Sequence, residues 1–558
     1  MKARAYKLMK EWCDTLLSYQ VKTVHPHTNN SLLCPTCHVV HGRIADLCFP
    51  LTVLWAESGE ESYLLQADAL IDWTELNLKS TDGLWYNDAS NRWFATSAFA
   101  AMSIGDALIN FGGRLPSELY QKWLGIFVRI SDTLMTVDTR PTFRPVVNYY
   151  CGIAVELAMA SKITGDKKYY EKSKYWIGVA LERFDRDGLL YGEGYPMEAS
   201  DGSHTVDMGY NLEESLPLLL RYAEITGEYK ELFRERFCDH IAFILPDGAI
   251  DNSFGTRHNK WTYWGSRTSD GIVSAFSMIA DDPMLVDVCE RALTLYEKCT
   301  HGGLLGMPMA EDAGEPTCLH HTFVHAKALA ALFCAENVPE RVERTVLPCE
   351  KPYGVKEYQN GRLCLMSDGK FRATVSAVRA MLLPEDASNG GGSLNLLYHR
   401  DRGVICAATS AEYVPSEPLN QQYLRHSDTV PCMTAQFYVD GRMGCKDKNV
   451  RLTHTDCSVT ATAEKWSATY SLGDSFRLDL SSENGSYALP IVCHVNERVE
   501  LSDDKKTLRI GESITVRSTA EMTVDPDKRV FNQVGGFLYL PVTVAVMGSV
   551  SVEITVCE

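Results

Sequence analysis

Cations and aromatic rings are concentrated between Asp247 and Gly271, in the sequence DGAIDNSFGTRHNKWTYWGSRTSDG. Guanidinium groups bind carboxylates through two hydrogen bonds, and imidazole or phenol groups transfer protons near neutral pH. The glycines and polar residues are not typical of a protein core. We predict a loop that binds an anionic sugar; the alternative is a stack of arginine and tryptophan that only fastens the loop. The residues concerned are Arg257, His258, Lys260, Trp261, Tyr263, Trp264 and Arg267.

Residues 1–338 alternate long amphipathic stretches with loops that contain glycine. Once a weaker member near Asp138 is counted, the loops recur roughly 50 to 60 residues apart, a period that fits two helices and two turns. About six such pairs close into an (α/α)6 toroid, in which loops of one class emerge at one end. We predict this toroid with a site at its mouth; the alternative is an open α-solenoid. The recurring loops start at Asp82, Asp187, Asp247 and Gly302, and turns between helices are predicted at Ser58-Gly59, Thr164-Gly165 and Thr226-Gly227.

Two further loops at the predicted mouth carry candidate binding residues. His41 and Arg43 precede the first apolar helix, where Arg43 could contact a ligand or pair with Asp46. His321 and His325 share one face of a helix, a spacing that can bind zinc, but no HExxH motif or companion carboxylate accompanies them. We interpret His321 as pocket lining and His325 as core.

Beyond Pro339 the sequence changes to short alternating runs of apolar and polar residues, separated by turn residues. This pattern is typical of antiparallel sheets. We therefore predict that residues 350–558 form an antiparallel β-sandwich domain.

The composition is that of an ordinary globular chain, with 558 residues of which 45% are hydrophobic and 23% charged. The net charge of −18 argues against nucleic acid and anionic membranes as partners. No apolar run is long enough for a membrane span and no signal-peptide core is present, so we expect a cytoplasmic protein, although a signal removed beforehand would leave no trace. Without a P-loop, a Rossmann glycine pattern or a G-x-S-x-G elbow, no organic cofactor is expected. The sequence gives no signal for an oligomeric state.

Eighteen cysteines are scattered along the chain, which fits reduced thiols with few or no disulfides. Cys34-Pro-Thr-Cys37-His38 matches both the attachment pattern of c-type haem and half of a zinc site. Haem is disfavoured because there is no export signal. A structural zinc needs two more ligands, for which His27, His41 and Cys48 are nearby; the alternative is a plain loop with buried thiols.

A helical toroid followed by an antiparallel β domain resembles the polysaccharide lyases of the heparinase II/III and alginate-lyase type. Asn148-Tyr149-Tyr150 opens an apolar helix, and Asp187-Gly-Leu-Leu-Tyr-Gly-Glu and the segment from Asp201 to Asn211 follow it. The resemblance implies that Asn148 neutralises a uronate carboxylate and that Tyr210 acts at C5. The segments CPTCHVVHGR and KWTYWGSRTSDG are similar to segments of a distinct branch of these lyases, which includes enzymes that remove rhamnose from rhamnosyl-glucuronate.

The resemblance fails at one place. Those lyases bring a His-rich segment from the first β strands, whereas this chain has a glycine run from Asn389 to His399. His204, His258 or His321 could replace the missing base, or Tyr210 could serve as both base and acid.

Lyase chemistry requires a group that neutralises the carboxylate, a base at C5 and an acid for the departing O4. We assign neutralisation to Asn148, Arg257 and Arg267, and proton transfer to Tyr210 and His258, with His204 in reserve. A tyrosine acts as a base near pH 7 only if cations favour its ionised form. The other predicted substrate contacts are Trp261, Tyr263, Trp264, His41, Arg43 and His321.

Two other functions remain open from the sequence. A glycoside hydrolase on the same toroid, resembling unsaturated glucuronyl hydrolases, would use paired carboxylates such as Asp88, Asp207 and Glu213. The excess of cations and rings over carboxylates in the 247–271 loop argues against it. A carbohydrate-binding protein without catalysis would need only the aromatic residues.

Overall fold

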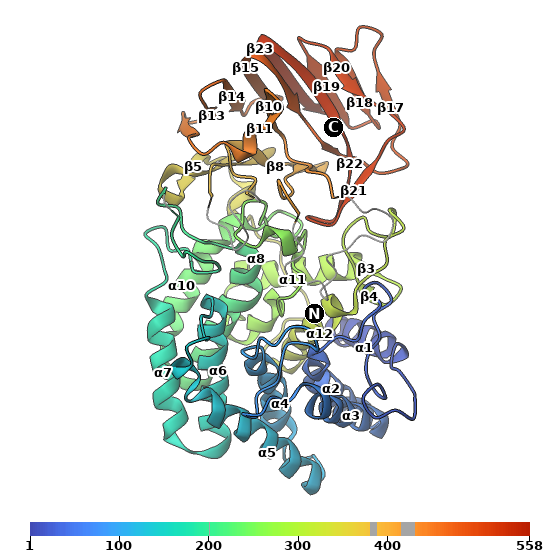
Figure 1. The fold of residues 1–558 in the computed structure, drawn as a ribbon, viewed down its shortest axis with the longest axis vertical. Coiled ribbons are helices and arrows are strands. Elements are labelled where there is room, and N and C mark those ends of the chain that lie inside the picture. Colours follow the sequence, from blue (N-terminus) through green and yellow to red (C-terminus); the bar gives the residue numbers. More distant parts are fainter. Residues whose placement is uncertain (200, 380–387, 414–429, 558) are drawn as a thin grey trace.

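The computed structural model describes residues 1–199, 201–379, 388–413 and 430–557. It consists of a helical half, drawn in blue to yellow-green in Figure 1, and a half made of sheets, drawn in yellow to red and lying above the helices in that view. Among the described residues, no helix is both long and apolar enough to cross a bilayer.

The centre of the helical half is a closed ring of segments that are buried on nearly every face. Each contacts the next in the order α2, α4, α6, α9, η6, α12 and back to α2. Helices that are apolar all round are expected where other helices enclose them. Their bounds are α2 (Cys48–Ser58), α4 (Ser97–Phe111), α6 (Val147–Thr164), α9 (Leu216–Thr226), the 3-10 helix η6 (Ile272–Met278) and α12 (Leu319–Cys334).

A layer of outer helices surrounds this ring, and each outer helix packs mainly on one inner segment. In α5, for example, Trp123, Phe127, Ile130 and Leu134 are buried while the opposite face is polar. The pairs, inner segment first, are α2 with α3, α4 with α5, α6 with α7, α9 with α10, η6 with α11 and α12 with α1. The outer bounds are α1 (Lys2–Ser18), α3 (Glu61–Leu78), α5 (Ser117–Leu134), α7 (Lys167–Leu181), α10 (Lys230–His240) and α11 (Pro283–Lys298).

The turns between paired helices use glycine in the left-handed region. Gly59, Gly165 and Gly227 end α2, α6 and α9 with φ of 75°, 75° and 79°. Glycine adopts this conformation without the steric cost that a side chain would bring. The predicted helix-to-helix turns are therefore present, and the closed ring confirms the (α/α)6 toroid over the open solenoid.

The sheets are antiparallel throughout. A five-stranded sheet runs β5-β6-β7-β8-β9, and a larger sheet runs β12-β13-β14-β15-β23-β19-β18-β17 with β10, β11 and β20 beside it. Side chains from both sheets, such as Met366 and Leu397 from one and Leu478 and Val552 from the other, share one apolar core. The predicted β-sandwich is thus confirmed.

The strands of these sheets and of a small sheet, β16-β22-β21, have the following bounds. They are β5 (Gly354–Tyr358), β6 (Leu363–Ser367), β7 (Phe371–Ser376), β8 (Ser393–His399), β9 (Gly403–Ala407), β10 (Gln436–Val439), β11 (Arg442–Met443), β12 (Arg451–His454), β13 (Ser458–Thr462), β14 (Trp466–Ser471), β15 (Phe476–Ala488), β16 (Ile491–Val492), β17 (Val499–Leu501), β18 (Thr507–Ile510), β19 (Ile514–Ser518), β20 (Met522–Val524), β21 (Val530–Asn532), β22 (Phe537–Leu540) and β23 (Val542–Val556). Two short hairpins lie in the helical half: β1 (Trp261–Thr262) with β2 (Gly265–Ser266), and β3 (Thr300–His301) with β4 (Leu304–Leu305).

The sandwich binds directly to the 247–271 loop of the toroid. Thr262 in the β1-β2 hairpin pairs with Gly535 in a parallel bridge, and the backbone N–H of Gly535 donates to the carbonyl of Trp261 at 2.9 Å. Nearby, Arg372 of β7 forms a buried ion pair with Asp251, Nη2 to Oδ2 at 2.9 Å. The sandwich therefore helps to set the conformation of this loop.

The glycine run from Asn389 to His399 makes part of the same contact. The side-chain amides of Asn389 and Asn395 both donate to the carbonyl of Ser253, at 2.8 and 3.0 Å. Where the resemblance would place a histidine base, this chain thus has two buried asparagines that fasten the toroid loop to the sandwich.

Candidate active site

A pocket opens where the N-terminal turns of several inner helices converge. Its lining comes from η1 (Arg43–Leu47), the first turns of α4, α6 and α12, the short helix α8 (Met208–Tyr210) and the 247–271 loop. Helix N-termini carry partial positive charge and free N–H groups. This arrangement favours an anionic ligand even though the whole chain is acidic. The lining residues are Arg43, Asn87, Asn91, Trp93, Thr96, Phe99, Asn148, Tyr149, Tyr210, Glu214, Arg257, Lys260, Thr268 and His320.

Tyr210 is positioned by an N-cap and an irregular helical turn. Asp207 caps α8, because its Oδ1 accepts a hydrogen bond from the backbone N–H of Tyr210 at 3.0 Å. Its Oδ2 accepts from the backbone N–H of Arg257 at 2.6 Å, which ties the helix to the 247–271 loop. The chain continues in a π-helical turn, Asn211–Ser215, into α9. Such turns are frequent at functional sites, and here both Tyr210 and Glu214 line the pocket.

The Tyr210 side chain lies between two cations. The guanidinium of Arg257 is 4.3 Å from the centre of its ring, and Nζ of Lys260 donates to its phenol oxygen at 3.4 Å. Oγ1 of Thr268 is 2.5 Å from the same oxygen. Positive charge this close to a phenol stabilises its ionised form relative to the neutral one.

Two buried carboxyl groups surround Asn148. Its Nδ2 donates to Oε1 of Glu214 at 2.7 Å, and its backbone N–H donates to Oε1 of Glu193 at 3.0 Å. Glu193 also pairs with Arg257, Oε2 to Nε at 3.2 Å. Burial raises the pKa of Glu214 to about 8, with Asp270 adding to the effect, and burial raises the pKa of Glu193 to about 7. Burial therefore favours the neutral form of the Glu214 carboxyl.

Arg43 pairs with Asp46, the structural alternative considered from the sequence, and it also lines the pocket. Its Nη2 lies 2.7 Å from Oδ2 of Asp46 and 3.8 Å from Oδ1 of Asp270. Lys327 of α12 binds the same Asp270 at 2.9 Å. This network of alternating charges holds the Arg43 side chain in place, through Asp46 just before α2 and through Lys327 in α12.

An aromatic surface borders the pocket on the α3–α4 loop. Trp93 is partly exposed, lies 5.2 Å from Tyr149 edge-on, and is parallel to Phe143 at 6.1 Å between ring centres. A partly exposed indole held by other rings offers a flat apolar face to a sugar.

Comparisons with known proteins identify the family. The family model for the ulvan lyase N-terminal domain matches residues 9–350, and the model for the C-terminal domain matches residues 355–471. A broad-specificity ulvan lyase of Formosa agariphila is 31% identical over 579 residues, which cover 96% of this chain and 90% of that protein. The chain belongs to the ulvan lyase family. It is therefore a polysaccharide lyase, as the sequence predicted.

Solved structures agree with the toroid and sandwich of this ulvan lyase family member. A heparinase III structure superposes with a TM-score of 0.53 and 13% identity, covering 91% of this chain and 76% of that one. The chondroitin AC lyase of Streptomyces coelicolor A3 superposes with a TM-score of 0.57 and 10% identity, covering 100% and 79%. At these identities the likeness shows the fold alone.

The prediction that the whole 247–271 loop binds sugar was wrong for four of its residues, because the sandwich and the toroid cover them. Trp261 and Trp264 are at most 1% exposed and donate their indole N–H to the carbonyls of Ile250 and Gly306. Tyr263 is buried and donates to Asp247 at 2.6 Å. Arg267 is also fully buried, and its guanidinium donates to carbonyls within the loop, including that of Lys260 at 3.3 Å. These four side chains are therefore packed inside the protein and are not part of the described pocket lining.

The predicted histidines also lie away from the described pocket lining. His258 is fully buried, its Nδ1 lies 3.1 Å from the carbonyl of Gly255, and burial lowers its pKa to about 4. His321 is fully buried beside Trp264. His41 is buried next to a cysteine, and His204 stacks on Tyr191 with 4.2 Å between ring centres. The structure thus brings Tyr210, Arg257, Asn148 and Arg43 together, but not these four histidines.

His204 provides a test of this correction. Its backbone N–H donates to the side chain of Gln359 in the sandwich, and its ring stacks on Tyr191 outside the described pocket lining. We expect turnover of His204→Ala to stay within a few-fold of the wild type, instead of falling by about 10²-fold or more as loss of a general acid or base would cause. Steady-state kinetics of the folded variant measure this, and a loss of the larger size would restore His204 to the proton-transfer machinery.

The carboxylates proposed for a hydrolase do not face one another across the pocket. Asp207 caps α8, and Oδ1 of Asp88 accepts hydrogen bonds from Ser90 and Asn91 within a turn. Glu213 is buried and accepts from the phenol of Tyr296 at 2.8 Å. Each of these carboxylates therefore has a structural role.

Sequence reasoning missed several residues of the pocket. Lys260 belonged to the conspicuous loop but received no role, and His320 was passed over in favour of its neighbour His321. Trp93 stood in a loop already placed at the toroid mouth. Thr268 carried no signal at all, because only the fold brings its hydroxyl to Tyr210.

Proposed function

We propose that this protein cleaves ulvan by β-elimination at O4 of a uronic acid, at bonds of the type L-rhamnose-α-1,4-D-glucuronate. Family membership and the ulvan lyase of Formosa agariphila support the substrate. The observation that carries the chemistry is the position of Tyr210 between Arg257 and Lys260. Asn148 and Glu214 lie next to it and form the proposed carboxylate-binding corner.

In this proposal the uronate carboxylate lies against Asn148 and Glu214. The amide of Asn148 and the protonated carboxyl of Glu214 donate to it without adding negative charge. Hydrogen bonds of this kind stabilise the charge that moves onto the carboxylate as C5 loses its proton. The partial positive ends of the inner helices, α6 above all, act in the same direction.

Tyr210 is the base. The C5–H bond breaks as its phenolate takes the proton, the electron pair forms the C4=C5 double bond, and the C4–O4 bond breaks. In glucuronate H5 and O4 lie on the same side of the ring, so the phenol can return the proton to this glycosidic oxygen, which departs bonded to C1 of rhamnose. Lys260 and Arg257 stabilise the phenolate between these two steps.

The test is ultraviolet absorbance during incubation with ulvan, arabinogalactan, heparan, alginate and pectic fragments, because β-elimination leaves a C4=C5 double bond conjugated to the carboxylate. We expect absorbance to rise with ulvan, with new reducing ends in equal number. Reducing ends without absorbance would indicate hydrolysis and contradict the proposed reaction; absorbance with another glycan alone would contradict the proposed substrate.

The raised pKa of Glu214 predicts a pH dependence. Below a pH of about 8 its carboxyl is neutral and donates to the substrate, whereas above it the ionised carboxylate repels the uronate. We expect kcat/KM of the wild type to fall as pH rises through this value, and Glu214→Gln, which cannot ionise, to lose that alkaline decline. Initial rates between pH 6 and 10 measure the effect.

Glu156 offers a matched control for this measurement. Burial also raises its pKa to about 8, but it lies in α6 against Ser131 and outside the described pocket lining. Glu156→Gln should therefore leave the alkaline decline in place. If both variants or neither remove it, the decline does not come from Glu214.

A further inference from the structure

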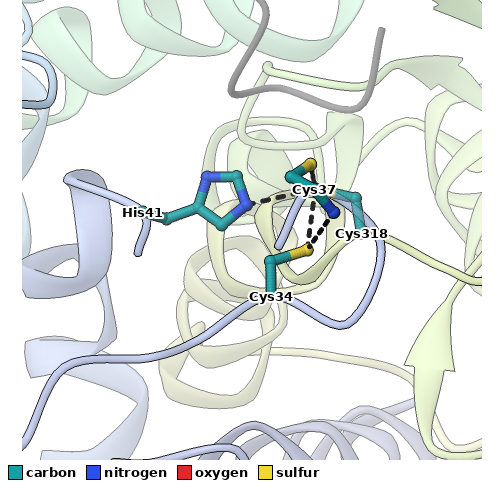
Figure 2. A group of neighbouring side chains, drawn as sticks. All are labelled: Cys34, Cys37, His41 and Cys318. Atoms are coloured by element: carbon teal, nitrogen blue, oxygen red, sulfur yellow. Dashed lines mark hydrogen bonds between the residues drawn. The ribbon is translucent and has the colours of Figure 1, made fainter. Parts of the chain in front are cut away.

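Four potential metal ligands lie together in the helical half (Figure 2). Cys34, Cys37 and His41 come from the loop after α1, and Cys318 immediately precedes α12. Their ligand atoms all lie within 4.8 Å of one another. Sγ of Cys318 is 3.8 Å from Sγ of Cys34, 3.6 Å from Sγ of Cys37 and 3.4 Å from Nε2 of His41.

These separations match a tetrahedral metal site. Zinc binds cysteine sulfur at about 2.3 Å and histidine nitrogen at about 2.0 to 2.1 Å, so two sulfurs on a tetrahedron are about 3.8 Å apart and a sulfur and a nitrogen about 3.6 Å. A disulfide would instead need about 2.05 Å between sulfurs. We propose that Cys34, Cys37, His41 and Cys318 bind one structural zinc ion.

The local backbone supports this assignment. The N–H of His38 donates to the carbonyl of Cys34 at 3.0 Å and the N–H of Cys34 donates to Val39 at 2.9 Å, which closes a tight turn. The N–H of Cys37 also points at Sγ of Cys34, at 3.4 Å. Hydrogen bonds to a ligand sulfur favour the thiolate, the form that binds metal.

The surroundings indicate a structural and not a catalytic metal. Cys34 and Cys318 are fully buried and His41 is 1% exposed, so four protein ligands close the site without leaving a position for substrate. Of the other ligands suggested by the sequence, Nδ1 of His27 contacts Asn77 instead, and Cys48 begins α2 outside the cluster.

The site would close the toroid. Three ligands follow the first helix of the chain and the fourth caps the last helix of the ring, and α1 and α12 pack on each other. Two residues after His41 lies Arg43, and two after Cys318 lies His320, both of which line the pocket. The zinc thus holds two parts of the pocket wall in register. This inference does not depend on the substrate of the enzyme.

The metal content of the full-length protein tests the proposal. Expressed in zinc-containing medium and desalted under reducing conditions, the wild type should hold about one zinc per chain by elemental analysis. Cys34→Ser and Cys318→Ser should lose it, whereas Cys48→Ser, which removes a buried thiol outside the cluster, should retain it. Wild-type protein without stoichiometric zinc, or Cys318→Ser with as much zinc as the wild type, would overturn the site.

Cobalt substitution of the wild type keeps the proposal testable if the serine variants fail to fold. Tetrahedral Co²⁺ with three thiolates gives intense visible bands and a thiolate charge-transfer band, whereas octahedral Co²⁺ gives weak bands. We expect the intense spectrum at about one Co²⁺ per chain. Weak bands alone would contradict the proposed ligands.

Discussion

Tyr210→Phe is expected to lower kcat by about 10³-fold or more while leaving the protein folded. The substitution removes only the phenol oxygen that Lys260 and Thr268 contact, and the ring stays packed against Arg257. Without this oxygen the proposed base can no longer take the C5 proton and return it to the glycosidic oxygen. Single-turnover and steady-state rates of double-bond formation on ulvan measure the loss.

Tyr263→Phe is the matched control for this variant. Tyr263 belongs to the loop that carries Arg257 and Lys260, but its phenol donates to Asp247 and lies outside the described pocket lining. We expect near-normal turnover and a stability loss of about 1 kcal/mol from the missing hydrogen bond. If Tyr210→Phe is folded and retains a third or more of wild-type activity, Tyr210 is not the base.

Asn148→Ala is expected to reduce kcat by about 10²- to 10³-fold with a smaller change in KM. Negative charge on the uronate carboxylate group grows as C5 loses its proton, so the amide contributes more in the transition state than in the bound substrate. The variant also leaves Glu214 without the donor at 2.7 Å that orients it. Separate values of kcat and KM on ulvan decide the role.

Asn110→Ala is the matched control. Asn110 lies near the C-terminal end of α4, away from the turns that form the pocket. Its Nδ2 donates to the backbone carbonyl of Asp106 in the same helix. It should leave both constants unchanged. A rise in KM alone for Asn148→Ala would mean that Asn148 only binds substrate and does not stabilise the charge that develops on the uronate carboxylate.

The fold could be predicted because its signals are local and repeated. Glycines such as Gly59, Gly165 and Gly227 recur at the ends of helices, and the change to alternating apolar and polar residues beyond Pro339 indicates the sheets. Each helical hairpin buries one apolar face against the next hairpin, so the same pattern of apolar residues and turns recurs in the sequence of every repeat.

The site was only partly predictable, because burial depends on partners far away in the chain. Tyr210 and Asn148 were found through the order of short motifs. Trp261 was assigned to the substrate, although its carbonyl accepts from Gly535, a residue of the other half. His41 was assigned to the pocket, although Cys318, 277 residues further on, lies beside its ring. Neither neighbour could be inferred from a local pattern.

The hydrogen bonds between the sandwich and the 247–271 loop also bear on how such enzymes can evolve. A chain cut between residues 350 and 355, where the two family models meet, would leave the buried carboxylate of Asp251 without Arg372 and the edge of the β1-β2 hairpin without Gly535. A toroid from one relative could be recombined with a sandwich from another only if the loop and its partners were exchanged together. Substitutions at Arg372 or Gly535 in the sandwich would therefore also act on the 247–271 loop of the toroid.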